Sequence, residues 1–311
     1  MEHGSHGHAH AHRHDHGHAH GAKGSAFAAG VVLNLAIVVL EGIYGVAAHS
    51  MALLADAGHN LGDVMGLVLA GGAAWLARGR PTTRRTYGYR RLTLLAALAN
   101  GVLLLVATGG VAWESIERLG TPAAVDARTV LLVATIGAVV NGASAALFFA
   151  GRKEDLNVRA AFVHLAGDAA ISVGVILATL VMLKTGWSWV DPAVGLVVSI
   201  LILVTTWSLL RKAVDLVIDA VPENIDIDAV RAYLQGLAGV REVHDLHVWA
   251  MSTTEVALTA HLVMPASISG ARFLGDVCGE LHERFGIEHA TLQVEPEEAP
   301  DPCRLAPPER V

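Results

Sequence analysis

The stretch "FVHLAGDAAISVGVILATLVML", residues 162–183, decides the fold of this chain. It contains only two ionisable side chains, those of His164 and Asp168, in a long run of mainly apolar residues. A helix rises about 1.5 Å per residue, so a segment of this length crosses a hydrocarbon layer about 30 Å thick. The sequence therefore predicts a membrane-spanning helix that holds a histidine and an aspartate inside the membrane.

The whole chain has the composition of a membrane protein. Of its 311 residues, 53% are apolar and 16% are charged, whereas about 25% of a soluble domain is charged. We expect an integral membrane protein with an all-α, six-helix transmembrane bundle over residues 26–212. The net charge of −7 offers no basic surface for nucleic acid. The six predicted spans are residues 26–47, 52–77, 92–113, 129–150, 160–183 and 190–210.

The remaining residues divide into one domain and two tails. In residues 213–296, charged residues recur regularly, and the apolar positions follow helix and strand periods in the order αββαβ. This order predicts a small α+β domain. Residues 1–25 are histidine-rich and of low complexity, so we expect a disordered tail that binds metal weakly or is simply solvated. Residues 297–311 form a C-terminal tail.

The basic residues of the loops predict the orientation. They gather in the connections after the second and fourth spans and at the end of the sixth, and the other loops have few. The positive-inside rule then places both termini and the α+β domain in the cytoplasm, with the spans in the cell membrane. The basic residues are Arg78, Arg80, Arg84, Arg85, Arg90 and Arg91, then Arg152, Lys153 and Arg159, then Arg211 and Lys212.

Two of the spans contain the same pair of ionisable residues. The second span reads "HNLGD", with His59 and Asp63, and the fifth reads "HLAGD", with His164 and Asp168. Residues four apart project from one face of a helix. If the two faces meet, two imidazoles and two carboxylates surround one point, which suits a tetrahedral zinc ion.

The alternative is that these polar residues only join helices. An ionised aspartate at mid-membrane costs a few kcal/mol, so two pairs at identical spacing favour the metal site. The chain has no His-Glu-x-x-His string and no phosphate-binding loop. We therefore expect no enzyme activity, but a site that fills from one side of the membrane and empties to the other. Asp56 either lines the access path or packs as a polar group, and Glu41 either lines the cavity or bonds helices together.

The strings "ADAGHNLGD", "TYGYRRLTLLAALANG", "VHLAGD" and "HDLHVWAM" resemble the cation diffusion facilitator family, in its zinc-exporting branch. The resemblance implies a homodimer with a metallochaperone-like cytoplasmic domain that exports zinc in exchange for protons by alternating access. It places His59, Asp63, His164 and Asp168 at the transport site. Zinc is then the transported ion, and no other cofactor is expected.

The resemblance also implies a zinc site in the α+β domain. Its candidate ligands are His244, His261, His289 and Glu295, and the alternative is that these are strand-edge residues with no metal. A different function remains open at this point, namely a membrane-bound zinc sensor that binds the metal without moving it.

Overall fold

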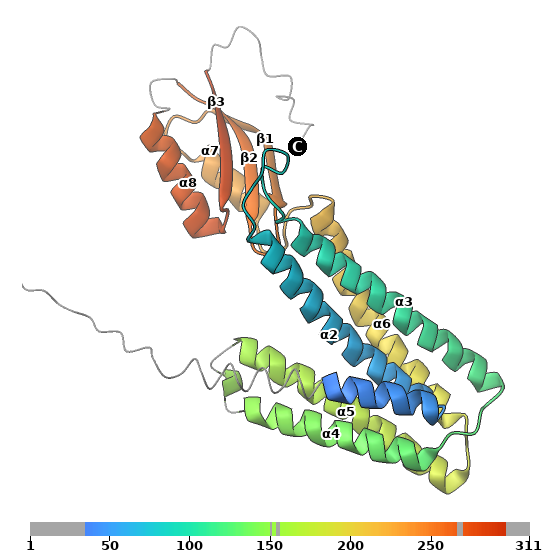
Figure 1. Ribbon diagram of the computed structural model, residues 1–311. Helices are drawn as coiled ribbons and strands as arrows, with labels where there is room; N and C mark the ends of the chain where they lie inside the picture. Colours follow the sequence, from blue (N-terminus) through green and yellow to red (C-terminus); the bar gives the residue numbers. More distant parts are fainter. Residues whose placement is uncertain (1–34, 150, 154–155, 266–269, 297–311) are drawn as a thin grey trace, which may run out of the picture.

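The structure, a computed structural model, describes residues 35–149, 151–153, 156–265 and 270–296. Within these residues, long apolar helices form one part of the molecule, and a small domain with a β-sheet is attached at one end of them (Figure 1). The predicted tails, residues 1–25 and 297–311, lie outside the described residues.

Five of the described helices are long and apolar enough to cross a membrane. A further apolar helix, Leu35–Ala47, lies within the first predicted span, which is described only from Leu35 onward. A single turn of 3-10 helix, η1 (Gly151–Lys153), lies before α5. The membrane-domain fold predicted from the sequence is therefore confirmed. The five helices are α2 (Met51–Ala77), α3 (Leu92–Gly120), α4 (Ala127–Phe148), α5 (Leu156–Thr185) and α6 (Val190–Val217).

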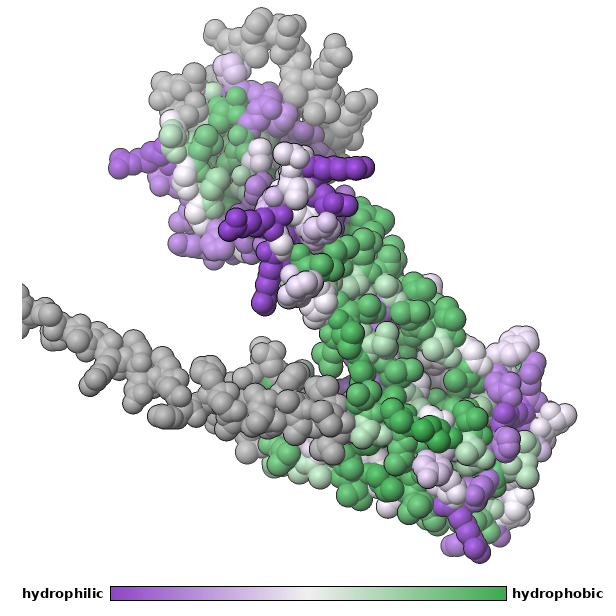
Figure 2. Space-filling view, viewed as in Figure 1, coloured by the Kyte–Doolittle hydropathy of each residue, from purple (hydrophilic) through white to green (hydrophobic). Residues whose placement is uncertain are grey.

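The side surface of these helices is apolar. Figure 2 shows hydrophobic residues along the visible sides of the long helices and hydrophilic ones gathered at their ends. Leu67, Val106, Leu147 and Val204 are each more than half exposed, which suits contact with lipid. Polar ends and apolar sides are the surface that a bilayer requires.

The start of α2 is fixed by an aspartate from α6. Ser50 caps the helix, because its Oγ accepts a hydrogen bond from the Leu53 backbone N–H. Asp191 then accepts hydrogen bonds from Ser50 Oγ at 2.5 Å and from the Met51 backbone N–H at 2.6 Å. Gly195 lies so close to Met51 that a Cβ on it would come within 2.8 Å. These contacts hold α2 and α6 together at this end.

The helices form two groups that diverge from a shared end (Figure 1). In one group, α3 packs against α6 and α2, and in the other, α4 packs against α5. Near the shared end, Leu53 of α2 packs with Val133 of α4 and Val175 of α5 in one buried cluster. Each group is therefore a packed unit, and the two meet chiefly through α2, α5 and α6.

The C-terminal domain has the predicted αββαβ order. Two helices and a three-stranded sheet share one hydrophobic core, which includes Val230, Leu258 and Leu281. In the sheet, the first strand pairs antiparallel with the second, and the second pairs parallel with the third. The elements are α7 (Ile227–Gln235), β1 (Glu242–Ala250), β2 (Val256–Val263), α8 (Ala271–Phe285) and β3 (His289–Glu295).

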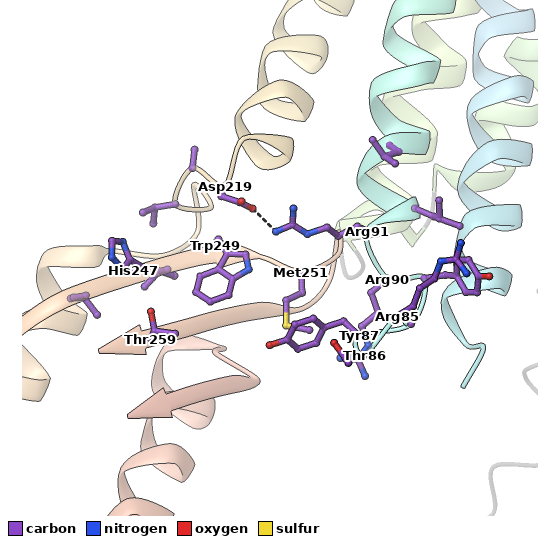
Figure 3. Close-up of a pocket in the computed structure, with 18 of the residues that line it drawn as sticks. Arg85, Thr86, Tyr87, Arg90, Arg91, Asp219, His247, Trp249, Met251 and Thr259 are labelled. Atoms are coloured by element: carbon purple, nitrogen blue, oxygen red, sulfur yellow. Dashed lines mark hydrogen bonds and ion pairs between the residues drawn. The ribbon is translucent and has the colours of Figure 1, made fainter. Parts of the chain in front are cut away.

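The loop between α2 and α3 rests on the C-terminal domain. Figure 3 shows Arg91 pointing at Asp219, with Tyr87 beside Met251 of the sheet region. Arg91 Nη2 lies 2.8 Å from Asp219 Oδ1, and Arg90 Nη1 lies 3.1 Å from Glu255 Oε2. A cavity of about 930 Å³ lies between the loop and the sheet. The arginine-rich loop and the C-terminal domain therefore lie at the same end of the spans.

Candidate metal centre

Two pairs of histidine and aspartate meet between α2 and α5. His59 Nε2 lies 3.4 Å from Asp168 Oδ1 and 3.7 Å from Asp63 Oδ2. His164 Nε2 lies 3.4 Å from Asp63 Oδ2 and 3.5 Å from Asp168 Oδ2. Each imidazole nitrogen therefore faces both carboxylates. The structure brings together the four residues selected from the sequence, and we call them the membrane centre.

The spacing of these atoms suits a tetrahedral zinc ion. Nitrogen and oxygen ligands about 2.0–2.1 Å from such an ion lie about 3.3 Å from one another. The four nitrogen–oxygen distances in the membrane centre, 3.4 to 3.7 Å, are close to that edge length. Asp63 Oδ2 and Asp168 Oδ2 are buried and accept no hydrogen bond from the described residues. Two nitrogens and two carboxylate oxygens are a donor set that zinc accepts readily.

The membrane centre is accessible on one side only. The exposed fraction of its side chains is 42% for His164, 28% for Asp63, 19% for His59 and 3% for Asp168. One turn further along α5, toward Thr185, Ser172 is fully buried. Among the described residues, the centre is therefore most exposed at His164, and it is buried at Asp168 and Ser172.

Asp56 lies outside the membrane centre. Its Oδ2 accepts a hydrogen bond from Ser172 Oγ at 3.2 Å, and the residue is almost wholly buried. No pattern in the sequence pointed to Ser172 as its partner. Asp191, which holds the start of α2, was likewise missed, although an aspartate in the first turn of an apolar span was a visible signal.

A second group of possible ligands lies on the sheet of the C-terminal domain. His244 of β1 stands opposite His261 of β2, and their ring centroids are 5.2 Å apart. Glu295 of β3 lies between them, with Oε1 2.9 Å from His261 Nδ1 and Oε2 3.5 Å from His244 Nε2. One ligand atom from each residue lies within 4.8 Å of the others. We call these three residues the sheet cluster.

The structure does not bring His289 to the sheet cluster. His289 begins β3 and pairs with Ala257, whereas Glu295 ends the same strand beside Val263. Its ring instead packs edge-on against Tyr87, at a centroid distance of 5.6 Å. The physical reason is strand length: residues six apart on a strand are about 20 Å apart.

Asp245 also lies beside the sheet cluster, although the sequence analysis did not select it as a candidate ligand. Its Oδ2 lies 3.5 Å from His261 Nε2, and its Oδ1 lies 2.9 Å from His247 Nε2. On a regular strand, Asp245 would point to the face opposite His244. The register shifts between His244 and His247, and Asp245 has a φ of 50°. Such a bulge re-aims side chains, so the neighbours His244 and Asp245 both lie near His261.

Comparison with known proteins identifies the family. Residues 27–217 match the cation efflux transmembrane domain, and residues 222–297 match the cation efflux protein cytoplasmic domain. The zinc transporter ZitB of Escherichia coli (strain K12) is 37% identical over 288 residues, covering 91% of each chain. The cadmium, cobalt and zinc/H(+)-K(+) antiporter of Bacillus subtilis (strain 168) is 33% identical over 282 residues, covering 89% of this chain and 90% of the relative.

A solved structure matches the C-terminal part of the chain. The metal-bound C-terminal domain of the CzcD transporter from Cupriavidus metallidurans is 30% identical, with a TM-score of 0.22. It covers 23% of this chain, which in turn covers 99% of that domain. With two family models matched over residues 27–217 and 222–297 and relatives similar along most of its length, this chain belongs to the cation efflux family.

Proposed function

We propose that this chain is a zinc efflux transporter that exchanges zinc for protons across the cell membrane. The observation that carries the proposal is the meeting of His59, Asp63, His164 and Asp168 at distances typical of a tetrahedral zinc site. The relatives' names support the same activity, since one is a zinc transporter and another a cadmium, cobalt and zinc/H(+)-K(+) antiporter.

The chemistry of the membrane centre accounts for the exchange. Zinc binds an imidazole only in its neutral form, so zinc binding displaces protons from His59 and His164. Protonation of the same nitrogens releases zinc. With Asp63 and Asp168 both ionised, the zinc-loaded centre has no net charge, which lowers the cost of holding it inside the membrane.

The arrangement of the helices accounts for alternating access. His59 and Asp63 belong to the group of α2, α3 and α6, and His164 and Asp168 belong to the group of α4 and α5. The membrane centre thus lies between two packed units. Rocking one unit against the other closes the His164 side and opens the opposite side, while the four ligands stay together.

We further propose that both termini and the C-terminal domain lie in the cytoplasm and that the chain forms a homodimer. The contact between the arginine-rich loop and the C-terminal domain supports a common side for both. The match of residues 222–297 to a cytoplasmic domain supports the same orientation. In the sheet cluster, His244, His261 and Glu295 would hold a second zinc ion.

The proposal is tested with the purified full chain in liposomes that contain a zinc-sensitive dye. An imposed proton gradient should drive zinc in the direction opposite to the proton flow. The zinc flux should stop when a protonophore removes that gradient. The double variant His59→Ala and His164→Ala should show no flux. His282→Ala, an exposed histidine outside both ligand groups, is the matched control. Zinc binding without any flux in the unaltered chain would instead indicate the sensor.

A further inference from the structure

A fully buried glutamate lies beside the membrane centre without belonging to it. Glu41, on the helix Leu35–Ala47, is 0% exposed. Asn60 Nδ2 of α2 donates a hydrogen bond to Glu41 Oε2 at 3.2 Å. The other carboxyl oxygen, Oε1, is buried and has no hydrogen-bond partner among the described residues.

Glu41 and Ser172 of α5 both lie beside a glycine of α4. A Cβ on Gly137 would lie 2.8 Å from Glu41 Oε1 and 3.3 Å from Ser172 Oγ. Both oxygens therefore lie next to Gly137 of α4, where there is no side chain. Ser172 Oγ donates to Asp56 Oδ2, and Ser172 follows Asp168 by one helical turn. Glu41 thus belongs to a buried polar group that includes Asp56 and Ser172, and the charge of Asp168 acts on it.

The described side chains around Glu41 offer fewer hydrogen-bond donors than its ionised carboxylate and that of Asp56 could accept. Asn60 and Ser172 supply donors, but the acceptors Glu41 Oε1, Asp56 Oδ1 and Asn60 Oδ1 receive no hydrogen bond from the described residues. Within the described part of the chain, no lysine or arginine forms an ion pair with Glu41 or Asp56.

A proton on the carboxyl of Glu41 would resolve this shortage. A buried carboxylate with no cation is very costly, whereas a protonated carboxyl is itself a donor. The titratable groups whose charges act on Glu41 are Asp56 from α2 and Asp168 from α5. Gly137 is its neighbour from α4.

We propose that Glu41 holds one of the protons that this chain exchanges for zinc, in a buried carboxyl site separate from the membrane centre. This inference rests on the proposed exchange of zinc for protons. The proton on Glu41 and the zinc ion both neutralise one cluster of buried carboxylates. Each therefore weakens the binding of the other, and the effect is reciprocal.

The test compares zinc binding by the full chain and by Glu41→Gln in detergent over a range of pH. Glutamine keeps the size of the side chain and its contact with Asn60, but has the charge of the protonated acid at every pH. In alkaline buffer the variant should bind zinc about 5- to 150-fold more weakly, the usual range of coupling between two sites. In acidic buffer the two affinities should converge. The number of protons released per zinc should fall by about one.

Two further variants guard against an effect on folding. Glu41→Asp, which keeps a carboxyl group, should keep the pH dependence of zinc binding. Asp126→Asn, at an exposed acid outside the buried cluster, should leave that pH dependence unchanged. Equal affinities of the unaltered chain and Glu41→Gln at every pH would overturn the inference. A constant difference at every pH would overturn it too, because that is the sign of a purely structural role. The readout is binding, so an absence of zinc flux would count against the proposed function alone.

Discussion

Asp168 is the least exposed of the four residues of the membrane centre. Its two carboxyl oxygens face different imidazoles, since Oδ1 lies 3.4 Å from His59 Nε2 and Oδ2 lies 3.5 Å from His164 Nε2. Asp63, in contrast, uses only Oδ2 toward both histidines. Asp168 therefore faces one imidazole of α2 and one of α5 through separate oxygens.

We expect Asp168→Asn to weaken zinc binding at the membrane centre by more than about 100-fold, because loss of even an outer-shell partner costs about 10- to 100-fold. The variant should insert and fold normally, since asparagine has the same shape. Zinc titration of the purified protein measures the loss. Asn141→Ala, at a buried residue of α4 outside the centre, is a useful comparison for the loss of a buried polar group alone. Normal zinc flux in Asp168→Asn would remove Asp168 from the ligand set.

His59→Asp should change the choice of metal. The substitution leaves one nitrogen and three carboxylates, a set that suits harder ions such as manganese better than zinc. It also adds a negative charge in a place of low dielectric, so one carboxyl should take up a proton near neutrality. We expect weaker zinc transport, broader selectivity and an altered pH dependence. Competitive uptake of zinc, cadmium and manganese into proteoliposomes measures all three. Unchanged selectivity would mean that His59 is not a ligand.

At the scale of helices and strands, hydropathy predicted the apolar part of a helix better than the residue at which the helix ends. The predicted spans 92–113 and 190–210 correspond to α3 and α6, which continue to Gly120 and Val217. Both continuations are more polar, with Glu114, Glu117 and Arg118 in one of them. A helix leaving the membrane keeps its backbone hydrogen bonds, so its polar end does not show in an apolar window.

The sequence predicted the His–Asp pairs because their spacing is local, but contacts between distant residues left no such sign. Asp191 meets Ser50 across 141 positions. The position of Asp245 depends on a bulge in β1, and one extra residue in a strand reverses which face each side chain takes. His289 was predicted with the sheet cluster because it shares β3 with Glu295, but the two stand at opposite ends of that strand, about 20 Å apart.

A zinc site at the sheet cluster can be tested with a control residue, His289, on the same strand as Glu295. His261→Ala should remove one bound zinc equivalent from the C-terminal domain, because His261 contacts Glu295 and Asp245 directly. His289→Ala, at the far end of β3, should remove none. The metal content of the two variants after gel filtration decides the matter. Equal zinc loss in both, or in neither, would contradict a site built from His244, His261 and Glu295.

Asp126 caps α4 and makes the stability of that helix depend on pH. Hydrogen bonds from the Thr129 side chain and backbone lower the pKa of Asp126 below its ordinary value. A lowered pKa stabilises the fold above the ordinary carboxyl pKa, and this stabilisation is lost as the pH falls through the lowered value. Asp126→Ala should therefore unfold at a lower temperature at neutral pH, and the difference should shrink in acid. Thermal unfolding followed by circular dichroism tests this, with the alternative cap Asp126→Ser as control.

At the scale of the whole molecule, the ion pairs at the junction between the spans and the C-terminal domain are exposed or partly exposed. Arg91–Asp219 and Arg90–Glu255 are ion pairs at the surface, and the Thr253 backbone N–H donates to Thr93 Oγ1 at 3.1 Å. The domain itself has a hydrophobic core of its own. Exposed ion pairs each contribute only about 0–1 kcal/mol. We therefore expect them to bear on the orientation of the two parts more than on the stability of either.

The ion pairs of this junction lead us to expect that loss of Arg90 and Arg91 changes the mobility of the C-terminal domain relative to the spans. In the double variant Arg90→Ala and Arg91→Ala, each part should unfold at its usual temperature, but the C-terminal domain should move more freely against the spans. Spin labels on Cys278 of α8 and on Leu103→Cys of α3, in a Cys303→Ser background, report this as a broader distance distribution.

Salt and a neighbouring arginine supply the controls. High salt screens exposed charges, so it should broaden the distribution of the unaltered chain in the same way. Arg84→Ala, in the same loop but without a carboxylate partner among the described residues, should leave it narrow. A distribution that stayed narrow in the double variant would show that packing around the cavity of about 930 Å³, rather than the ion pairs, sets the orientation of the domain.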